Sequence, residues 1–289
     1  MQPAEISVPL SWGTLAGLHW RNPGAPKVLC LHGWLDNSAS FIPLSPYLAD
    51  YDVVALDFAG HGKSDHRPPA SRYYFSEYVY DLDASLDQLE WDRCHIIGHS
   101  LGGGMGSQYA AAMPERVERL VMLDTIGVIT RSPQETASQL RLSIKSVRSD
   151  RSFLRPYQSV NEAVSSRQRK SELSTDATRL LVERALEHVG SHYQWRTDPR
   201  LNWRSPLLMT IEQALSVLNH ISAPTLTITT PAITDFLGQE AFDLRLAAIK
   251  HCEHHHLEGH HHIHMESPQL LSGIITPFLN QQEQDNDHQ

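Results

Sequence analysis

The stretch that most constrains this chain is a glycine-flanked serine between an apolar run and a helical pattern. The run Cys94–Ile97 predicts a buried strand, the pentapeptide GHSLG follows at residues 98–102, and Leu101–Met113 has a helical pattern. A serine at so tight a strand-to-helix turn adopts a strained backbone conformation, and the flanking glycines leave room where a Cβ would collide with neighbouring backbone. The turn raises the hydroxyl of Ser100 above the sheet, in front of the amides of a helix N-terminus. We therefore predict that Ser100 is a nucleophile; the alternative is a glycine-rich turn with an incidental serine.

Short apolar runs alternate with longer amphipathic stretches along most of the chain. The runs show little internal alternation of apolar and polar residues, which is typical of strands covered on both faces. The pattern predicts an α/β fold, with a mostly parallel central sheet and helices on both faces. The expected strands are Thr14–Trp20, Lys27–Leu31, Asp52–Asp57, Cys94–Ile97, Leu120–Leu123, Thr225–Thr229 and His254–Leu257, and the expected helices are Tyr73–Glu90, Leu101–Met113, Gln239–Lys250 and Pro268–Asn280.

The alternation is interrupted from about Gly127 to His220. This stretch is polar and arginine-rich, with helical patterns and no convincing strand; Ser174, for example, precedes a capped amphipathic helical pattern. We predict a helical lid or cap at residues 127–220, inserted into a core formed by residues 1–126 and 221–280, with a frayed polar tail at 281–289. The alternative is a structural extension with no role in access to the site.

A second loop is expected beside the serine. The strand predicted at Lys27–Leu31 ends in HGWLDN at residues 32–37. Sites built on such a serine turn take one oxyanion donor from the loop after the third strand and one from the residue after the nucleophile. We predict that the backbone amides of Trp34 and Leu101 form this oxyanion hole, with ordinary loop packing as the alternative. The candidates for lining a substrate pocket are His32, Gly33, His99 and Trp195.

With these motifs placed, the chain resembles the α/β-hydrolase superfamily over nearly its whole length. More narrowly, it is similar to the serine hydrolase-like proteins, the group that includes kraken. The segments that carry the resemblance are VLCLHGWLDNSASF at 28–41, VVALDFAGHGKSDH at 53–66, WDRCHIIGHSLGGG at 91–104, RLVMLDT at 119–125 and GHHHIHMESPQ at 259–269. The first and third are distinctive, whereas the stretch predicted as a lid matches only loosely. The resemblance implies esterase-type or related hydrolase activity and leaves the substrate undefined.

The C-terminal motif supplies several candidates for a general base. Histidines stand at positions 260, 261, 262 and 264, in a loop expected after the last strand. In the superfamily pattern a Glu follows the catalytic histidine by five places and a Pro comes next, which Glu266 and Pro268 satisfy for His261. We therefore predict His261 as the base, with His260 as the second choice and with His262 and His264 in packing or capping roles.

Two aspartates fit the chain order serine, acid, histidine that this fold requires. Asp124 directly follows the strand Leu120–Leu123, in the setting RLVMLDT. Asp235 follows Thr225–Thr229, where the superfamily more often places its acid, but the intervening PAIT departs from the usual short turn. The sequence favours Asp124 and keeps Asp235 as its rival, and either could be a turn or cap carboxylate. Asp57 precedes the serine in the chain and is assigned to loop structure near the site.

Charge and composition exclude several kinds of partner. Against 24 Lys and Arg stand 33 Asp and Glu, a formal net charge of −9, which argues against nucleic acid or an anionic membrane as main partner. No apolar run is long enough to span a bilayer and no signal-peptide pattern opens the chain. The 3 cysteines have no metal-like spacing, which fits reduced thiols in a cytoplasmic protein. No dinucleotide-binding or phosphate-binding glycine loop is present, and the histidines at 251 and 254–256 lack the spacing of a helical metal motif, so neither a cofactor nor a metal is expected.

Together these patterns predict a serine hydrolase that transfers the acyl group of a small carboxylic ester to water through an acyl-serine intermediate. The expected partner is a small-molecule substrate, and the patterns do not distinguish a monomer from a homodimer. One alternative is a carbon–carbon bond hydrolase or a perhydrolase on the same residues. Others are a catalytically weak small-molecule receptor and a scaffold whose arginine-rich segment at 141–170 docks an acidic partner.

Overall fold

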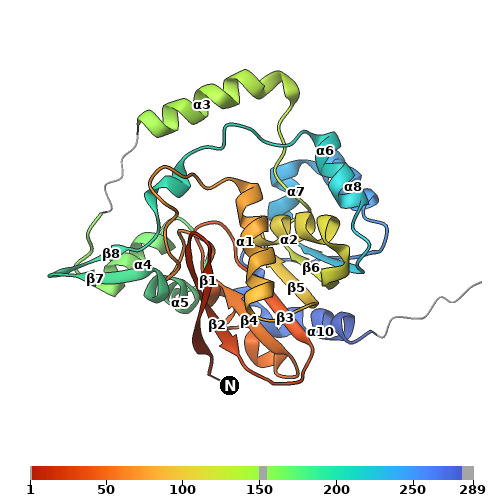
Figure 1. Ribbon diagram of the computed structural model, residues 1–289, viewed down its shortest axis with the longest axis horizontal. Coiled ribbons are helices and arrows are strands. Elements are labelled where there is room, and N and C mark those ends of the chain that lie inside the picture. Colours follow the sequence, from red (N-terminus) through yellow and green to blue (C-terminus); the bar gives the residue numbers. More distant parts are fainter. Residues whose placement is uncertain (1, 150–154, 282–289) are drawn as a thin grey trace, which may run out of the picture.

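The computed structural model describes residues 2–149 and 155–281 and consists of one central sheet covered by helices (Figure 1). The sheet has 8 strands in the order β1-β2-β4-β3-β5-β6-β9-β10. The strands β1 and β2 pair antiparallel, and the pairs from β4 to β10 are parallel. The predicted α/β fold with a mostly parallel sheet is therefore confirmed. The tail predicted at 281–289 lies outside the described residues from 282 onwards.

Each predicted strand is present, with shifts of a few residues at the ends. The strands are β1 Ala4–Leu10, β2 Gly13–Trp20, β3 Lys27–Leu31, β4 Asp52–Leu56, β5 Cys94–His99, β6 Val117–Leu123, β9 Thr225–Thr229 and β10 Cys252–His256. The strand β1 was not predicted. It is an edge strand in which Val8 is the buried residue and most others are exposed, so it has no apolar run to reveal it.

The inner strands feed two cores because successive side chains point to opposite faces of a sheet. Leu29, Leu31 and Ile96 pack on one face against α1 Phe75–Gln88, α2 Leu101–Ala112, α6 Ile211–Asn219 and α8 Gln239–Ala248. Their neighbours along the strands, Val28, Cys30 and Ile97, pack on the other face against α10 Pro268–Leu279 and the short helix η1 Ser38–Phe41. The loops that lead from the parallel strands to these helices lie at the carboxyl ends of the strands, where the site is expected.

Between β6 and β9 the chain leaves the sheet. It forms α3 Thr136–Arg148, α4 Val160–Gln168, α5 Thr175–Ala185, the strands β7 Leu186–Val189 and β8 His192–Trp195, and then α6. In Figure 1, α3 lies above the sheet and the β7–β8 hairpin lies beyond α4 and α5. The predicted cap of α5 is confirmed, since the side chain of Ser174 accepts a hydrogen bond from the amide of Ala177.

The expectation that this segment contains no strand was wrong. The strands β7 and β8 pair antiparallel from Leu186 with Trp195 to Val189 with His192. The two residues between them begin with Gly190, whose φ of 60° fits a tight hairpin turn. Gly-Ser between two short runs is a hairpin signal, so the sequence contained the information. The helical pattern of the neighbouring residues obscured it.

Three contacts attach α5 to the sheet and its loops. Arg184 Nε donates to both carboxylate oxygens of the buried Asp57, at 2.9 Å each. Asn37 Nδ2 donates to the carbonyl oxygen of Leu181 at 2.9 Å. The carboxylate of Glu266 accepts from the amide of Ser174, just before α5, at 2.7 Å. The position of α5 is therefore set by loops that also carry predicted site residues.

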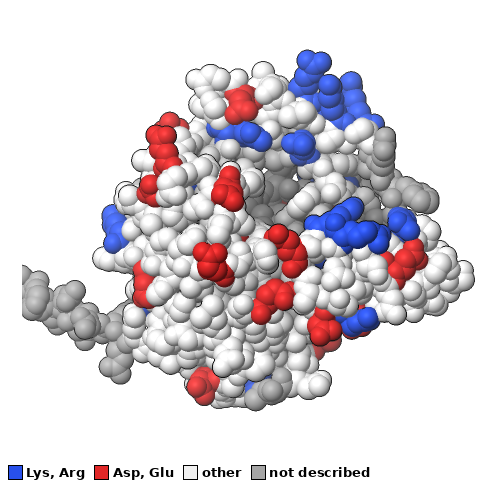
Figure 2. Space-filling view, turned by 180° about the vertical axis from the view of Figure 1, so that it is seen from behind, with Lys and Arg blue, Asp and Glu red and all other residues white. Residues whose placement is uncertain are grey.

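The surface agrees with the acidic composition. On the face seen in Figure 2, acidic side chains are spread widely, whereas Lys and Arg gather mainly toward one side. In the described part of the chain, no helix has both the length and the apolar content needed to cross a membrane.

Candidate active site

The turn after β5 has the strained geometry that the sequence predicts. Ser100 has φ 51° and ψ −115°, and it is the residue before the first turn of α2. A Cβ on Gly98 would lie 2.5 Å from the backbone of Gly102, and a Cβ on Gly102 would lie 2.1 Å from the carbonyl oxygen of Leu31. Both flanking positions therefore require glycine because backbone passes within contact distance.

A continuous hydrogen-bonded chain connects this serine to the loop after β10 and to the end of β6. Ser100 Oγ lies 2.9 Å from His261 Nε2, and His261 Nδ1 lies 2.6 Å from Asp124 Oδ2. Asp124 is completely buried, whereas the side chain of His261 is 41% exposed and can be reached from solvent. Because the carboxylate only accepts, Nδ1 carries the hydrogen and Nε2 faces the serine hydroxyl with a lone pair.

The buried aspartate is held in place from a neighbouring strand. Its Oδ1 accepts from the amide of Thr230 at 2.7 Å and from the Thr230 hydroxyl at 2.9 Å, which leaves Oδ2 for His261. Asp124 itself has a positive φ of 47°, an uncommon conformation for a residue with a side chain. Thr230 directly follows β9 and is the N-cap of the next helix. It was not singled out from the sequence, since no motif marks a threonine at such a position as a partner of a catalytic acid.

The rival candidates lie elsewhere. Asp235 is exposed in α7 Pro231–Leu237, and among the described residues no hydrogen bond joins it to His261. The residues after β9 form this helix instead of the short turn usual in the superfamily, because Thr230 caps it and Pro231 suits its first position. His260 points to Glu172 at the surface, with Nδ1 3.0 Å from Oε2.

The loop after β3 lies beside the serine turn. Residues 33–36 form a β-turn, in which the amide of Asp36 donates to the carbonyl oxygen of Gly33 at 3.1 Å. Leu35 has φ 62°, the positive value that the third residue of a type II turn requires. The Trp34 amide takes no part in that turn bond, and its side chain is 51% exposed. Leu101 is the first residue of α2, where an amide has no partner within the helix.

Two of the residues predicted to line a pocket, His32 and His99, have no exposed surface. His32 instead supports the loops, because its ring nitrogens contact the carbonyl oxygen of Gly33 at 2.7 Å and the amide of Phe58 at 3.0 Å. Gly33 lies against His99, since a Cβ there would be 2.8 Å from His99 Nδ1. Trp195 packs in the hairpin, where its Nε1 donates to the hydroxyl of Tyr157 at 3.2 Å.

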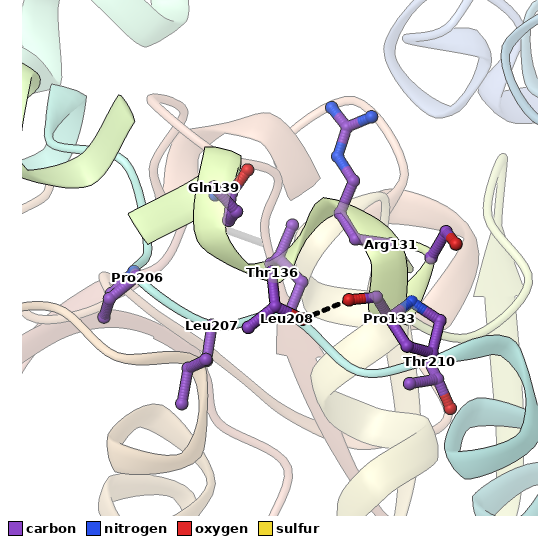
Figure 3. Close-up of a pocket in the computed structure, with 9 residues that line it drawn as sticks. Arg131, Pro133, Thr136, Gln139, Pro206, Leu207, Leu208 and Thr210 are labelled. Atoms are coloured by element: carbon purple, nitrogen blue, oxygen red, sulfur yellow. Dashed lines mark hydrogen bonds between the residues drawn. The ribbon is translucent and has the colours of Figure 1, made fainter. Parts of the chain in front are cut away.

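A separate pocket lies at the base of α3 (Figure 3). Arg131, Thr136, Gln139 and Thr210 are among its lining residues, all from the segment between β6 and β9. None of Ser100, His261 and Asp124 lines this pocket, so the pocket is not part of the candidate active site.

The chain matches a known family. The model of the alpha/beta hydrolase fold matches residues 26–231. The chain belongs to this α/β-hydrolase family. A serine hydrolase-like protein of Danio rerio is 32% identical, over 98% of this chain and 90% of its own length. Serine hydrolase-like protein 2 of Homo sapiens is 29% identical, over 96% of this chain and 94% of its own length. The resemblance inferred from the motifs is confirmed.

Solved structures give the same result for this α/β-hydrolase. The crystal structure of a hypothetical protein from Pseudomonas aeruginosa PAO1 matches with a TM-score of 0.90 and 33% sequence identity. The match covers 97% of this chain and all of that one, 100%. The similarity therefore includes the segment between β6 and β9 as well as the sheet.

Proposed function

We propose that the protein is a serine hydrolase that cleaves a small carboxylic ester through an acyl-serine intermediate. The observation that carries the proposal is the hydrogen-bonded chain from Ser100 Oγ through His261 to the buried Asp124. A serine hydroxyl is a weak nucleophile at neutral pH and needs an adjacent base that is itself oriented by a third group. The geometry of the three side chains supports these roles.

In this mechanism His261 Nε2 takes the proton of Ser100 Oγ as the oxygen attacks the ester carbonyl. Asp124 orients the ring and stabilises its charged form without taking the proton. The amides of Trp34 and Leu101 are the proposed donors to the oxyanion. His261 then gives its proton to the leaving alcohol, and later it activates the water that hydrolyses the acyl-serine.

We further propose that residues 127–220 form a lid over this site, inserted into a core of residues 1–126 and 221–280. The attachment of α5 to Asp57, Asn37 and Glu266 supports it, since Asp57 and Asn37 follow strands at the carboxyl end of the sheet and Glu266 follows His261 in the chain by five residues. Free cysteines at 30, 94 and 252, the first two buried, suit a reducing compartment such as the cytoplasm.

The test is a series of p-nitrophenyl esters of graded acyl length, hydrolysed by the full chain and by Ser100→Ala. We expect hydrolysis of short esters and a loss of at least about 10³-fold in kcat/KM in the variant. Ser107→Ala, which changes a buried serine in the middle of α2, is the matched control and should keep the activity. The rate that remains in Ser100→Ala measures background hydrolysis by other groups. Equal rates in Ser100→Ala and in the unmodified protein would refute the proposal. Absent turnover with ligand-induced thermal stabilisation would instead indicate a small-molecule receptor.

A further inference from the structure

A cluster of two histidines and one aspartate lies directly behind the hydrogen-bonded chain of the candidate site. His99 precedes the serine on β5, His262 follows His261 along the chain, and Asp36 comes from the loop after β3. One atom of each residue, His99 Nδ1, His262 Nε2 and Asp36 Oδ2, lies within 4.8 Å of the other two. The side chains of His99 and Asp36 are only 1% and 2% exposed.

The hydrogen bonding of His99 determines which of its ring nitrogens carries a proton. Nε2 lies 2.8 Å from the backbone carbonyl oxygen of His261, which can only accept, so Nε2 donates. In a singly protonated ring with the proton on Nε2, the other nitrogen, Nδ1, presents a lone pair. Nδ1 is therefore a lone pair, and it has no hydrogen-bond partner among the described residues.

This lone pair faces a carboxylate oxygen. His99 Nδ1 lies 3.7 Å from Asp36 Oδ2. The same oxygen, Asp36 Oδ2, lies 3.0 Å from His262 Nε2. His99 Nδ1 is the atom left without a partner, and a cation or a bridging donor between it and Asp36 Oδ2 would satisfy it.

The spacing of the three atoms fits metal ligands. Zinc bonds of about 2.0–2.1 Å to nitrogen and oxygen in a tetrahedral site place neighbouring ligand atoms roughly 3.4 Å apart. Asp36 Oδ2 lies 3.0 Å from His262 Nε2 and 3.7 Å from His99 Nδ1, on either side of that value. The hydrogen bond from His99 Nε2 to a backbone carbonyl is also the outer contact that metal-binding histidines usually make.

Arg167 determines which oxygen of Asp36 is available. Its guanidinium donates to Asp36 Oδ1 and, at 3.0 Å, to the carbonyl oxygen of Leu35. Oδ1 is therefore occupied and Oδ2 turns toward the histidines. The positive charge of Arg167 also lowers the affinity for a cation, so the site suits an ion that binds imidazole strongly.

We propose that Asp36, His99 and His262 form a binding site for a transition-metal ion of the zinc class, with an open fourth position. Two imidazoles and one carboxylate favour Zn²⁺ over Mg²⁺ or Ca²⁺, which prefer oxygen ligands. To bind the ion, His262 presents the lone pair of Nε2, and its ring proton is then carried on Nδ1. The ion joins His262, the neighbour of His261, to β5 and to the loop after β3, and it therefore stabilises the histidine loop.

The test uses untagged full-length protein freed of metal with a chelator, and Zn²⁺ alone as the probe in titration calorimetry. His262→Gln keeps a hydrogen-bond donor for Asp36 but removes the imidazole. His260→Gln is the matched control, since His260 lies in the same loop and pairs with Glu172 at the surface. We expect one Zn²⁺ per chain, bound more than about 10-fold more weakly by His262→Gln and unchanged in His260→Gln. Ser100→Ala should bind Zn²⁺ normally, which separates this proposal from the hydrolase proposal.

A second measurement does not depend on the folding of a variant. Crystals of the unmodified protein soaked with Zn²⁺ should show an anomalous peak about 2.1 Å from each of the three ligand atoms. Equal Zn²⁺ affinity in His262→Gln and the unmodified protein would overturn the proposal. So would an anomalous map with zinc only at surface histidines, in which case a water molecule bridges His99 and Asp36.

Discussion

Replacement of Arg184 by leucine tests how the segment between β6 and β9 is attached to the sheet. The side chain of Arg184 is 5% exposed and that of Asp57 is completely buried. Removal of one partner of a buried ion pair costs about 3–5 kcal/mol, because the other charge remains buried without compensation. Asp57 keeps the amides of Ser38 at 2.7 Å and Lys63 at 2.8 Å, so we expect a loss near the lower limit, about 3 kcal/mol.

The assay is the melting temperature of the full chain, followed by urea unfolding. A loss of about 3 kcal/mol lowers Tm by roughly 5–10 °C in a protein of this size. Arg179→Leu is the control on the same helix, because Arg179 is 38% exposed and pairs with Glu183 at the surface; its expected cost is below about 1 kcal/mol. If Arg184→Leu melts at the same temperature as the control, the ion pair between Arg184 and Asp57 does not stabilise the attachment of this segment.

The pH dependence of this loss has a definite sign. Burial opposes the ionisation of Asp57, and Arg184 outweighs it and holds the pKa of the carboxyl below its usual range. Without Arg184 the pKa of Asp57 in the folded state rises above its value in the unfolded state. The cost of the buried carboxylate is then present at pH values above this raised pKa and is relieved as Asp57 becomes protonated at lower pH. The difference between variant and unmodified protein should therefore shrink on acidification. A double variant with Asp57→Asn should cost less than the sum of the two single changes.

Three further predictions follow from the site and its surroundings. Asp124→Asn should lower kcat/KM for the best ester by roughly 10³-fold or more while Asp235→Asn has little effect, and similar losses in both would contradict the assignment of the acid. Burial lowers the pKa of His95 to about 4 and of His61 and His264 to about 3, so these rings are neutral in the fold but charge at about 6.5 when unfolded. The contribution of these rings to the free energy of unfolding is then complete above pH ~6.5 and falls as the pH drops toward 4, by up to about 1.4 kcal/mol per pH unit for each ring. Burial raises the pKa of Asp81 to about 6, so its protonation in the folded state stabilises the fold on acidification and offsets the loss from one ring. Urea unfolding at pH 7 and pH 5 checks the sign, and greater stability at pH 5 would contradict it. Gly102→Ala should prevent folding or cost more than about 3 kcal/mol, since its Cβ would lie 2.1 Å from the Leu31 carbonyl oxygen. Gly273→Ala, with nothing within 4 Å of its Cβ, should be neutral or slightly stabilising by thermal melting.

The parts of the fold that sequence patterns predict are those in which local and tertiary requirements agree. Buried parallel strands need apolar residues on both faces, and the serine turn needs glycines at fixed positions, so both leave a strong pattern. The edge strand β1 and the β7–β8 hairpin have only one covered face or little burial, so their patterns are weak. The helix α7 was missed because an N-cap threonine and a proline also fit an ordinary turn.

The site could be predicted only in part, for a related reason. Ser100 and His261 stand in short motifs, and the order along the chain limits the acid to two candidates. The choice between them depends on where β6 and β9 end in space, and only coordinates show that Thr230 turns Asp124 toward His261. The cluster of Asp36, His99 and His262 joins three distant segments, so no spacing in the sequence reveals it.

The most direct measurement of the central claim is the covalent adduct formed with a fluorophosphonate probe, located by mass spectrometry of the digested protein. We expect one adduct per chain, on Ser100, absent in Ser100→Ala and formed far more slowly in His261→Gln because the base is lost. The folded state of each variant is checked by its melting curve. An adduct on another residue, or no adduct on folded protein that binds the probe, would contradict the claim that Ser100 is an activated nucleophile.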